Sequence, residues 1–276
     1  MPSPERLTSL QNPRVKELLG LRDRRDRDAR GLTLIEEPRV IRRARRAGYP
    51  FLEVWYCPEL LDAVDPELLA FLRAGEPFTA IEVTPSVMAK LAYKEKPEGV
   101  LVVAPQRRLA LDRLALPEAP LLLVLEAVEK PGNLGAILRV ADGAGADAVI
   151  VCDPGTDIFN PNVLRASTGA FFTVPVVEED ASRVRSWLRE RRIRGVATTP
   201  AAAAPYTDAD LRGPVAILLG AEDRGLSDEW LMRADLQVRI PMRGEADSLN
   251  VSVTAALMAY EAVRQRHLPP GTGRPG

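Results

Sequence analysis

The sequence has very little of the two residues on which most metal sites and disulfides depend. Its 276 residues include two cysteines, Cys57 and Cys152, and a single histidine, His267. The cysteines form no Cys-x-x-Cys pair, so neither a Cys/His metal site nor a disulfide framework is expected. Both lie among apolar, strand-like residues, which indicates that they fill the core of a protein of the reducing cytoplasm.

Long apolar runs and nucleotide-binding glycine patterns are also missing. Runs such as residues 121–125 are far shorter than the roughly 20 apolar residues that cross a membrane. No apolar segment follows the charged first residues, so neither a signal peptide nor a membrane partner is expected. G-x-G-x-x-G after a strand and the P-loop pattern are both absent, which disfavours a nicotinamide-dependent oxidoreductase.

Net charge is close to zero, at −1, but it is unevenly distributed. Residues 1–46 contain thirteen Lys/Arg and seven Asp/Glu, an excess of six positive charges. Such a local basic stretch can contact nucleic-acid phosphates while the whole protein stays near neutral. A solvated arginine-rich helix with internal ion pairs, as residues 22–28 would permit, is the alternative.

Apolar periodicity divides the chain into two α/β regions. Residues 9–28 are expected to form one helix, and short strands and helices then alternate, which predicts a small α/β domain over residues 1–105. Residues 106–120 are rich in proline and charge and are interpreted as a linker. Residues 121–276 again alternate between strand and helix. They are expected to form a parallel α/β sheet with helices on both faces.

Three polar stretches follow strand-like runs of the second region. They are residues 129–139, 220–226 and 240–252. The carboxyl ends of parallel strands meet at one edge of a sheet, where α/β proteins bind ligands. The third stretch leads into an apolar helix, and Ser248 and Asn250 stand where the first amide donors of that helix are unpaired. Taken alone, each stretch could be a surface loop before a capped core helix.

Taken together and in this order, the three stretches resemble the motifs of the SpoU (TrmH) family, S-adenosylmethionine-dependent RNA ribose 2′-O-methyltransferases of the SPOUT class. The residues that carry the resemblance are Asn133, Gly135 and Arg139, then Gly220, Glu222, Gly225 and Leu226, and finally Ile240, Pro241, Met242 and Ser248 to Ser252. Residues 1–105 resemble the family's RNA substrate-binding domain. The resemblance implies a homodimer, a trefoil knot over roughly residues 196–265, and rRNA as a preferred substrate over tRNA.

The resemblance also implies a cofactor site for S-adenosylmethionine. The residues expected to contact or lie near it are Thr198, Gly220, Ile240, Met242 and Leu249. Gly220 would let the backbone approach the cofactor closely. Core packing is the alternative role for Ile240, Met242 and Leu249.

Arg139 is expected to be essential for catalysis, and the matching arginine of the family is proposed to act across a dimer interface. An arginine is a poor base because its pKa exceeds roughly 12. Binding phosphate or ribose and stabilising developing negative charge are easier roles, and the proton acceptor stays open. Asn133, Glu222, Ser248 and Asn250 are expected to position Arg139, the loops and the substrate; plain loop and cap hydrogen bonding is the alternative.

Two arginines are candidate RNA contacts. Arg39 matches the last residue of the Glu-Gly-x-Arg pattern common in the family's substrate-binding domain, but Glu37 replaces the glycine, which puts a close backbone approach to RNA in doubt. Arg165 is a second candidate for phosphate contact, with a structural ion pair as the alternative. Glu126, Glu129 and Lys130 are interpreted as surface charges.

Other functions remain open at this point. A tRNA 2′-O-methyltransferase and a non-catalytic RNA-binding or ribosome-assembly factor of the same fold are the alternatives to an rRNA methyltransferase. Base identity in RNA is read through shape and loop contacts, so the sequence leaves open which nucleotide is modified and whether the role is housekeeping or antibiotic resistance.

Overall fold

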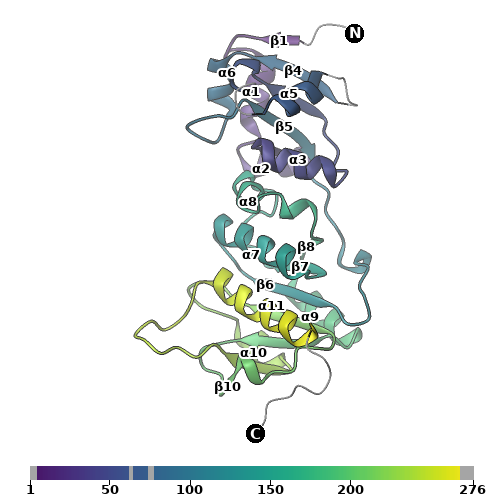
Figure 1. Cartoon of the computed structure of the whole chain (residues 1–276), viewed down its shortest axis with the longest axis vertical. Coiled ribbons are helices and arrows are strands. Elements are labelled where there is room, and N and C mark those ends of the chain that lie inside the picture. The colour runs from purple at the N-terminus through teal and green to yellow at the C-terminus, as the bar shows by residue number, and fades with distance from the viewer. Residues whose placement is uncertain (1–4, 62–64, 74–77, 268–276) are drawn as a thin grey trace. The chain divides into compact units, whose positions relative to one another are not determined.

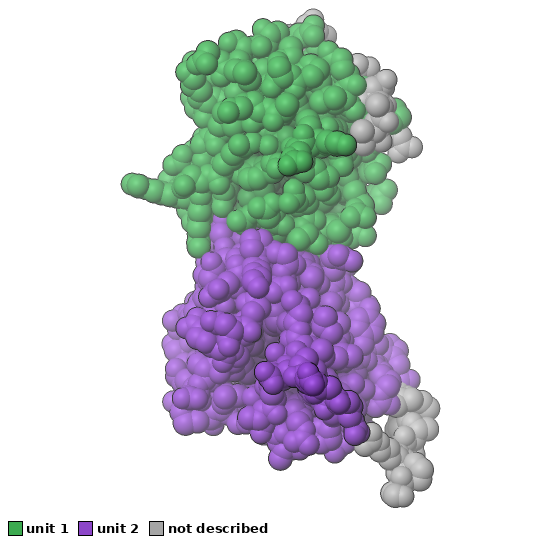
Figure 2. Space-filling view, turned by 90° about the vertical axis from the view of Figure 1, so that its left-hand side faces the viewer, with its two compact units in different colours: residues 1–107, 159–173 green, residues 108–158, 174–276 purple. Residues whose placement is uncertain are grey.

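The computed structural model of this chain describes residues 5–61, 65–73 and 78–267. The chain forms two compact units. Unit 1 consists of residues 1–107 and 159–173, and unit 2 of residues 108–158 and 174–276 (Figure 2).

Unit 1 contains a mixed five-stranded sheet in the order β1-β4-β3-β5-β2, in which β5 runs antiparallel to both of its neighbours. Its elements up to residue 107 are β1 (Glu5–Leu7), α1 (Pro13–Gly20), α2 (Arg24–Arg30), β2 (Leu32–Glu36), α3 (Pro38–Arg46), β3 (Glu53–Tyr56), α4 (Pro58–Leu61), α5 (Pro66–Arg73), β4 (Thr79–Val83), α6 (Pro85–Leu91) and β5 (Val100–Pro105).

The single helix expected over residues 9–28 is two helices. Asn12 caps α1 by accepting from the backbone N–H of Arg14 at 2.9 Å. Asp23 then begins α2, accepting from the N–H of Arg25 at 2.7 Å. Aspartate competes well for such cap positions, so the continuous helical pattern is broken here. The inner face of α1 packs on the sheet through Val15 and Leu18.

Residues 159–173 belong to unit 1 although the sequence places them within the second region. They contain α8 (Pro161–Ala166) and the short 3-10 helix η2 (Ala170–Phe172). The hydroxyl of Thr33 in β2 donates to the carbonyl oxygen of Phe159 at 2.8 Å. The rings of Tyr49 and Phe172 meet edge to face at 4.8 Å. The predicted domain limits therefore differ from this division at residues 159–173, because the contacts that decide it join residues more than a hundred positions apart.

Unit 2 contains a seven-stranded sheet in the order β10-β12-β9-β11-β6-β7-β8, and all of its pairings are parallel. The predicted parallel α/β sheet is thus confirmed. The elements are η1 (Leu111–Arg113), β6 (Leu121–Glu126), α7 (Pro131–Ala144), β7 (Ala148–Cys152), β8 (Val176–Glu179), α9 (Ala181–Glu190), β9 (Arg194–Thr198), β10 (Ala204–Pro205), η3 (Tyr206–Asp208), β11 (Val215–Leu219), α10 (Asp228–Arg233), β12 (Leu236–Arg239) and α11 (Val251–His267).

Helices cover both faces of this sheet. Alternate residues of β6, Leu122 and Val124, join the core that also contains Trp187 of α9 and Trp230 of α10. Successive side chains of a strand point to opposite faces, so the remaining residues of β6 face α7 and α11. These two helices lie side by side (Figure 1) and contact β6, β7 and β11.

Much of the segment interpreted as a linker packs onto unit 2. Leu109 pairs with Val177 of β8, and Leu111 and Leu114 are buried in the core under α9. Arg183 of α9 and Asp112 form an ion pair at 2.6 Å. The prolines and charges of residues 106–120 concealed these regularly placed leucines. In the described part of the chain, no helix is long and apolar enough to cross a membrane.

Candidate active site

A cavity of about 380 Å³ lies at the carboxyl ends of β9, β11 and β12. The parallel sheet brings these strand ends together, although the connecting loops lie far apart in the sequence. All five residues expected to contact the cofactor line the cavity, and so do two of the positioning residues; together they are Thr198, Gly220, Ile240, Met242, Leu249, Glu222 and Ser248. The volume suits a ligand of nucleoside size.

The apolar residues of the cavity are not part of a closed core. Ile240, Met242 and Leu249 are all half-buried and line the cavity. Carboxylates outnumber cations in the lining, with Asp223 and Asp247 beside Glu222 against a single arginine, Arg224. Apolar walls with an excess of negative charge suit a ligand that combines a flat base with a positive charge.

Gly220 is required by the protein's own backbone. A Cβ atom at this position would overlap the backbone of Gly225 and Leu226. The loop over residues 221–225 folds back on itself, because Ala221 and Gly225 exchange two backbone hydrogen bonds of 3.0 Å each. The loop that follows Gly220 therefore approaches it closely and shapes the cavity; the close approach of the cofactor to Gly220 stays a prediction.

A chain of side-chain hydrogen bonds joins the three motif stretches. Asn133, in the first turn of α7, donates to a carboxylate oxygen of Glu222 at 2.5 Å. Asn250 donates from its amide nitrogen to the side-chain oxygen of Asn133 at 3.1 Å. The other end of Asn250 caps α11 by accepting from the N–H of Ser252 at 2.9 Å. Asn250 therefore caps α11 and also links α11 to α7.

Glu222 is held as a carboxylate. Burial by itself raises its pKa, but the hydrogen bond from Asn133 and the backbone N–H groups of Glu129 and Lys130 outweigh burial and lower the pKa below its usual range. The two backbone donors precede α7, where the helix dipole also favours negative charge. A carboxylate with a lowered pKa is a weak base, so Glu222 is suited to holding loops and positive charge in place.

Arg139 does not reach the cavity of its own chain. It is exposed on α7, lines no part of the cavity and makes no hydrogen bond or ion pair with any residue that the structure describes. Arg139 lies six positions after Asn133 in α7, which is a rotation of about 600° around the helix axis, or about 240° once a full turn is subtracted. Asn133 and Arg139 therefore point to different sides of α7.

The two candidate RNA contacts both lie in unit 1. Arg39 is exposed in the first turn of α3 and has no recorded partner among the described residues. Arg165 lies on α8, where it donates to the side-chain oxygen of Asn162 at 2.9 Å and stabilises the ionised form of Glu36 through its charge. The structure thus places Arg165 beside the end of β2, close to the sequence region that contains Arg39.

Two residues interpreted as surface charges contribute to the site. Glu126, at the end of β6, accepts from the backbone N–H of Ser227 at 2.7 Å and so anchors the start of α10. The backbone of Glu129 supports Glu222. Their position just after the predicted strand of residues 121–125 was the signal that could have identified them. No cluster of His, Cys, Asp and Glu in the described residues could hold a metal ion.

These features are typical of a class of enzyme in which a parallel α/β protein binds a nucleoside-like cofactor in loops at the carboxyl edge of its sheet. Family comparisons agree. Residues 120–260 match the SpoU rRNA methylase family, and residues 12–102 match the MRM3-like substrate-binding domain.

Individual proteins resemble almost the whole chain. The 23S rRNA (uridine(2479)-2′-O)-methyltransferase of Streptomyces viridochromogenes is 34% identical, over 96% of this chain and 94% of the relative. A crystal structure of an RNA 2′-O ribose methyltransferase has 43% identity and a TM-score of 0.83, covering 95% of this chain and all of the other. The rRNA methyltransferase of Sinorhizobium meliloti with bound AdoMet has 30% identity and a TM-score of 0.85, with 96% and 99% covered. This chain belongs to the SpoU rRNA methylase family.

Proposed function

We propose that this protein is an S-adenosylmethionine-dependent RNA ribose 2′-O-methyltransferase that acts on rRNA. The observation that carries the proposal is the hydrogen-bonded chain Glu222–Asn133–Asn250, which joins the three motif stretches. The second and third of these stretches line one cavity of nucleoside size. Family membership supports the reaction, and relatives named for 23S rRNA methylation support rRNA over tRNA.

The residues of the cavity bind and orient. When bound, S-adenosylmethionine supplies an electrophilic methyl group. Ile240, Met242 and Leu249 offer apolar walls for its adenine, and the carboxylates of the lining attract its positive charge. We assign no proton-accepting role to Glu222, because its lowered pKa makes it a weak base.

We propose further that the active protein is a homodimer in which Arg139 enters the site of the partner. Arg139 is exposed and without a partner in the described residues, on a side of α7 that differs from that of Asn133. Neighbouring α11 exposes Val253 and Tyr260 at 46% and 50%, an apolar surface that a second subunit would cover. In the partner's site Arg139 would hold the ribose or phosphate and stabilise charge as the 2′-oxygen attacks.

Unit 1 is proposed to bind the RNA substrate, with Arg39 and Arg165 as phosphate contacts. The match of residues 12–102 to a substrate-binding domain supports this role. The trefoil knot and a cytoplasmic location are likewise proposed from family membership.

The proposal is tested by transfer of labelled methyl from S-adenosylmethionine to bulk rRNA and to bulk tRNA. Wild type is expected to label rRNA, and the labelled linkage should resist alkali because a 2′-O-methyl group removes the attacking hydroxyl. Arg139→Ala should lose at least about a hundredfold in kcat, with cofactor binding unchanged.

Each other outcome leads to a different conclusion. Label confined to tRNA would replace the proposed substrate. Absence of label in both RNAs and in ribosomal particles, with cofactor bound, would favour a non-catalytic RNA-binding factor.

A further inference from the structure

A second cavity in unit 2 has the composition of an anion site. It measures about 640 Å³ and lies between α9, α10 and the start of β9. No residue lines both this cavity and the cofactor cavity. Arg194 and Gly195 at the start of β9 line this cavity, whereas Thr198 at the end of β9 lines the cofactor cavity.

The helix α9 brings arginines to this cavity by its own periodicity. Positions 182, 185, 186 and 189 lie on one face, and all four line the cavity. The opposite face is buried in the core through Val184 and Trp187. Arg192 follows the helix with a left-handed φ of 55°, a conformation that usually favours glycine or asparagine.

Five arginines line the cavity against two carboxylates, and the carboxylates are already occupied. Glu229 pairs with Arg185 at 2.5 Å and with Arg233 at 3.9 Å. Asp235 accepts from the backbone N–H of Gly195 at 2.7 Å. The lining therefore keeps an excess of three positive charges.

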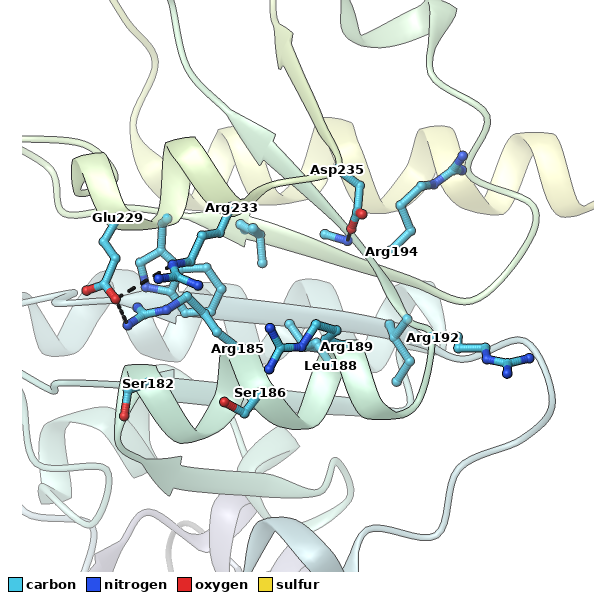
Figure 3. A pocket seen from close by; sticks show the side chains of 14 residues that line it. Ser182, Arg185, Ser186, Leu188, Arg189, Arg192, Arg194, Glu229, Arg233 and Asp235 are labelled. Atoms are coloured by element: carbon cyan, nitrogen blue, oxygen red, sulfur yellow. Dashed lines mark hydrogen bonds and ion pairs between the residues drawn. The ribbon is translucent and has the colours of Figure 1, made fainter.

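Two of the arginines have no partner of their own. Arg189 and Arg192 are exposed and form no hydrogen bond or ion pair with the residues that the structure describes. Figure 3 shows the arginines spread along the cavity, with Arg185 and Arg233 at one end, Arg189 in the middle, and Arg192 and Arg194 toward the other end. An elongated row of donors suits an extended polyanion better than a single small anion.

An aromatic donor lies in the same wall. Trp230 is 2% exposed and lines the cavity, and its indole N–H has no hydrogen-bond partner in the described part of the chain. The guanidinium of Arg185 stands over its ring at 5.1 Å. An unsatisfied buried donor favours a ligand that brings acceptor oxygens.

We infer that this cavity, defined by Arg185, Arg189, Arg192, Arg194, Arg233 and Trp230, binds the phosphodiester backbone of the RNA substrate at a second place, away from the methyl-transfer site. The inference rests on the proposed function, since it assigns the cavity to the same RNA. Phosphate contacts of this kind position a substrate without reading its bases. The cavity would hold an RNA segment flanking the modified nucleotide.

The test uses the full-length protein and two measurements. One is KM and kcat for bulk rRNA in the methyl-transfer assay. The other is the salt dependence of binding to a fluorescein-labelled single-stranded RNA of mixed sequence. The variants are Arg189→Gln/Arg192→Gln and the charge-preserving Arg189→Lys/Arg192→Lys, with Arg113→Gln as the matched control, since Arg113 is exposed in the same unit and lines neither cavity.

The glutamine pair is expected to raise KM for rRNA roughly tenfold and to reduce the slope of log Kd against log salt by about one to two, because each lost phosphate contact removes about 0.7 to 0.9 from the slope. We expect kcat and cofactor affinity to stay within about twofold of wild type. The lysine pair should restore most of the slope, and Arg113→Gln should match wild type.

A separate variant distinguishes lost contact from lost stability. Arg192→Gly removes the charge and also relieves the left-handed backbone at residue 192. Its Tm is expected to equal or exceed that of wild type while its RNA affinity falls.

The two proposals fail in different ways. An active wild type whose glutamine variant keeps the same KM and salt slope would overturn the RNA contact and leave the methyltransferase intact. In that case an acidic protein surface would become the occupant to seek. A wild type that binds RNA but transfers no methyl would overturn the activity, and the salt slope would still decide whether the cavity holds RNA.

Discussion

At the scale of single residues, Glu37 explains why the family pattern carries glycine at this position. Its φ is 83° although it is not a glycine, and its carboxylate pairs with Lys94 at 2.8 Å. A positive φ costs a side-chain-bearing residue about 1 to 3 kcal/mol. The replacement of glycine thus adds backbone strain between β2 and α3, and its effect on a close backbone approach to RNA stays a prediction.

The first prediction follows from that strain. Glu37→Gly is expected to be more stable than Glu37→Ala by about 1 kcal/mol or more, because both lose the ion pair but only glycine accepts the left-handed backbone. Lys94 keeps its second partner, Glu98, at 2.8 Å in either variant. Urea unfolding of the three proteins measures the difference, and equal stability of the glycine and alanine variants would show that residue 37 is unstrained.

Glu36 gives a second prediction, which concerns pH. Burial raises its pKa above the usual range, and the hydrogen bond from the backbone N–H of Tyr93 at 3.1 Å offsets burial only in part. The pKa of Glu36 in the folded protein thus exceeds its unfolded value of about 4.5. The contribution of the protonated Glu36 side chain to stability is therefore complete below pH 4.5 and is lost as pH rises through the folded pKa.

Replacing Glu36 with glutamine removes this loss. The Tm of Glu36→Gln relative to wild type is expected to increase as pH rises from 4.5 to 7.5, because glutamine places no charge in this buried position. Glu17→Gln, at an exposed position in the same unit, is the control and should show no such trend. A Tm difference that is flat across this pH range would mean that Glu36 is not destabilised by its charge.

At the scale of elements, the loop between β11 and α10 depends on Gly220. Alanine at this position would push residues 221–225 away from the strand end. We expect Gly220→Ala to weaken binding of S-adenosylmethionine at least about a hundredfold, because the loop supplies a wall of the cavity. Calorimetric titration measures the affinity. Gly213→Ala is the matched control, since its Cβ would meet nothing within 4 Å; normal cofactor affinity in Gly220→Ala would show that the loop accommodates the methyl group.

Local sequence patterns predict which segments of unit 2 form strands and which form helices in most cases. The apolar run of residues 121–125 forms β6, and Asn160 caps α8 just before Pro161; both features follow from periodicity and cap chemistry. The apolar residues 171–177 do not form one strand: residues 170–172 form a 3-10 helix, and β8 begins only at Val176. Phe171 and Phe172 stack against unit 1 aromatics, a contact that propensity along the chain does not reveal.

At the scale of the whole molecule, the position of Arg139 leads to a complementation test. If Arg139 serves the partner's cavity, Arg139→Ala and Gly220→Ala each have little activity alone at limiting S-adenosylmethionine, but they form hybrids with one intact site. Random pairing in a one-to-one mixture makes half of the dimers hybrid, so about a quarter of wild-type activity is expected to return.

The complementation test uses the two variants in equal amounts. The two variants are co-refolded, dimer formation is checked by size-exclusion chromatography, and methyl transfer to rRNA is measured. Neither substitution alters the exposed α11 residues Val253 and Tyr260. If activity in the mixture stays at the sum of the two variants, Arg139 acts within its own chain or the protein works as a monomer.

The sequence by itself determined the alternation of strands and helices, the three loops at strand ends and their membership of one family, because these depend on local periodicity and short motifs. Only the tertiary structure decided that Asn133 bonds Glu222 and Asn250, 89 and 117 residues away. It also decided that residues 159–173 join unit 1 and that arginines of α9 and α10 share a cavity. These pairings depend on strand order and helix packing, which bring together side chains that no local pattern connects.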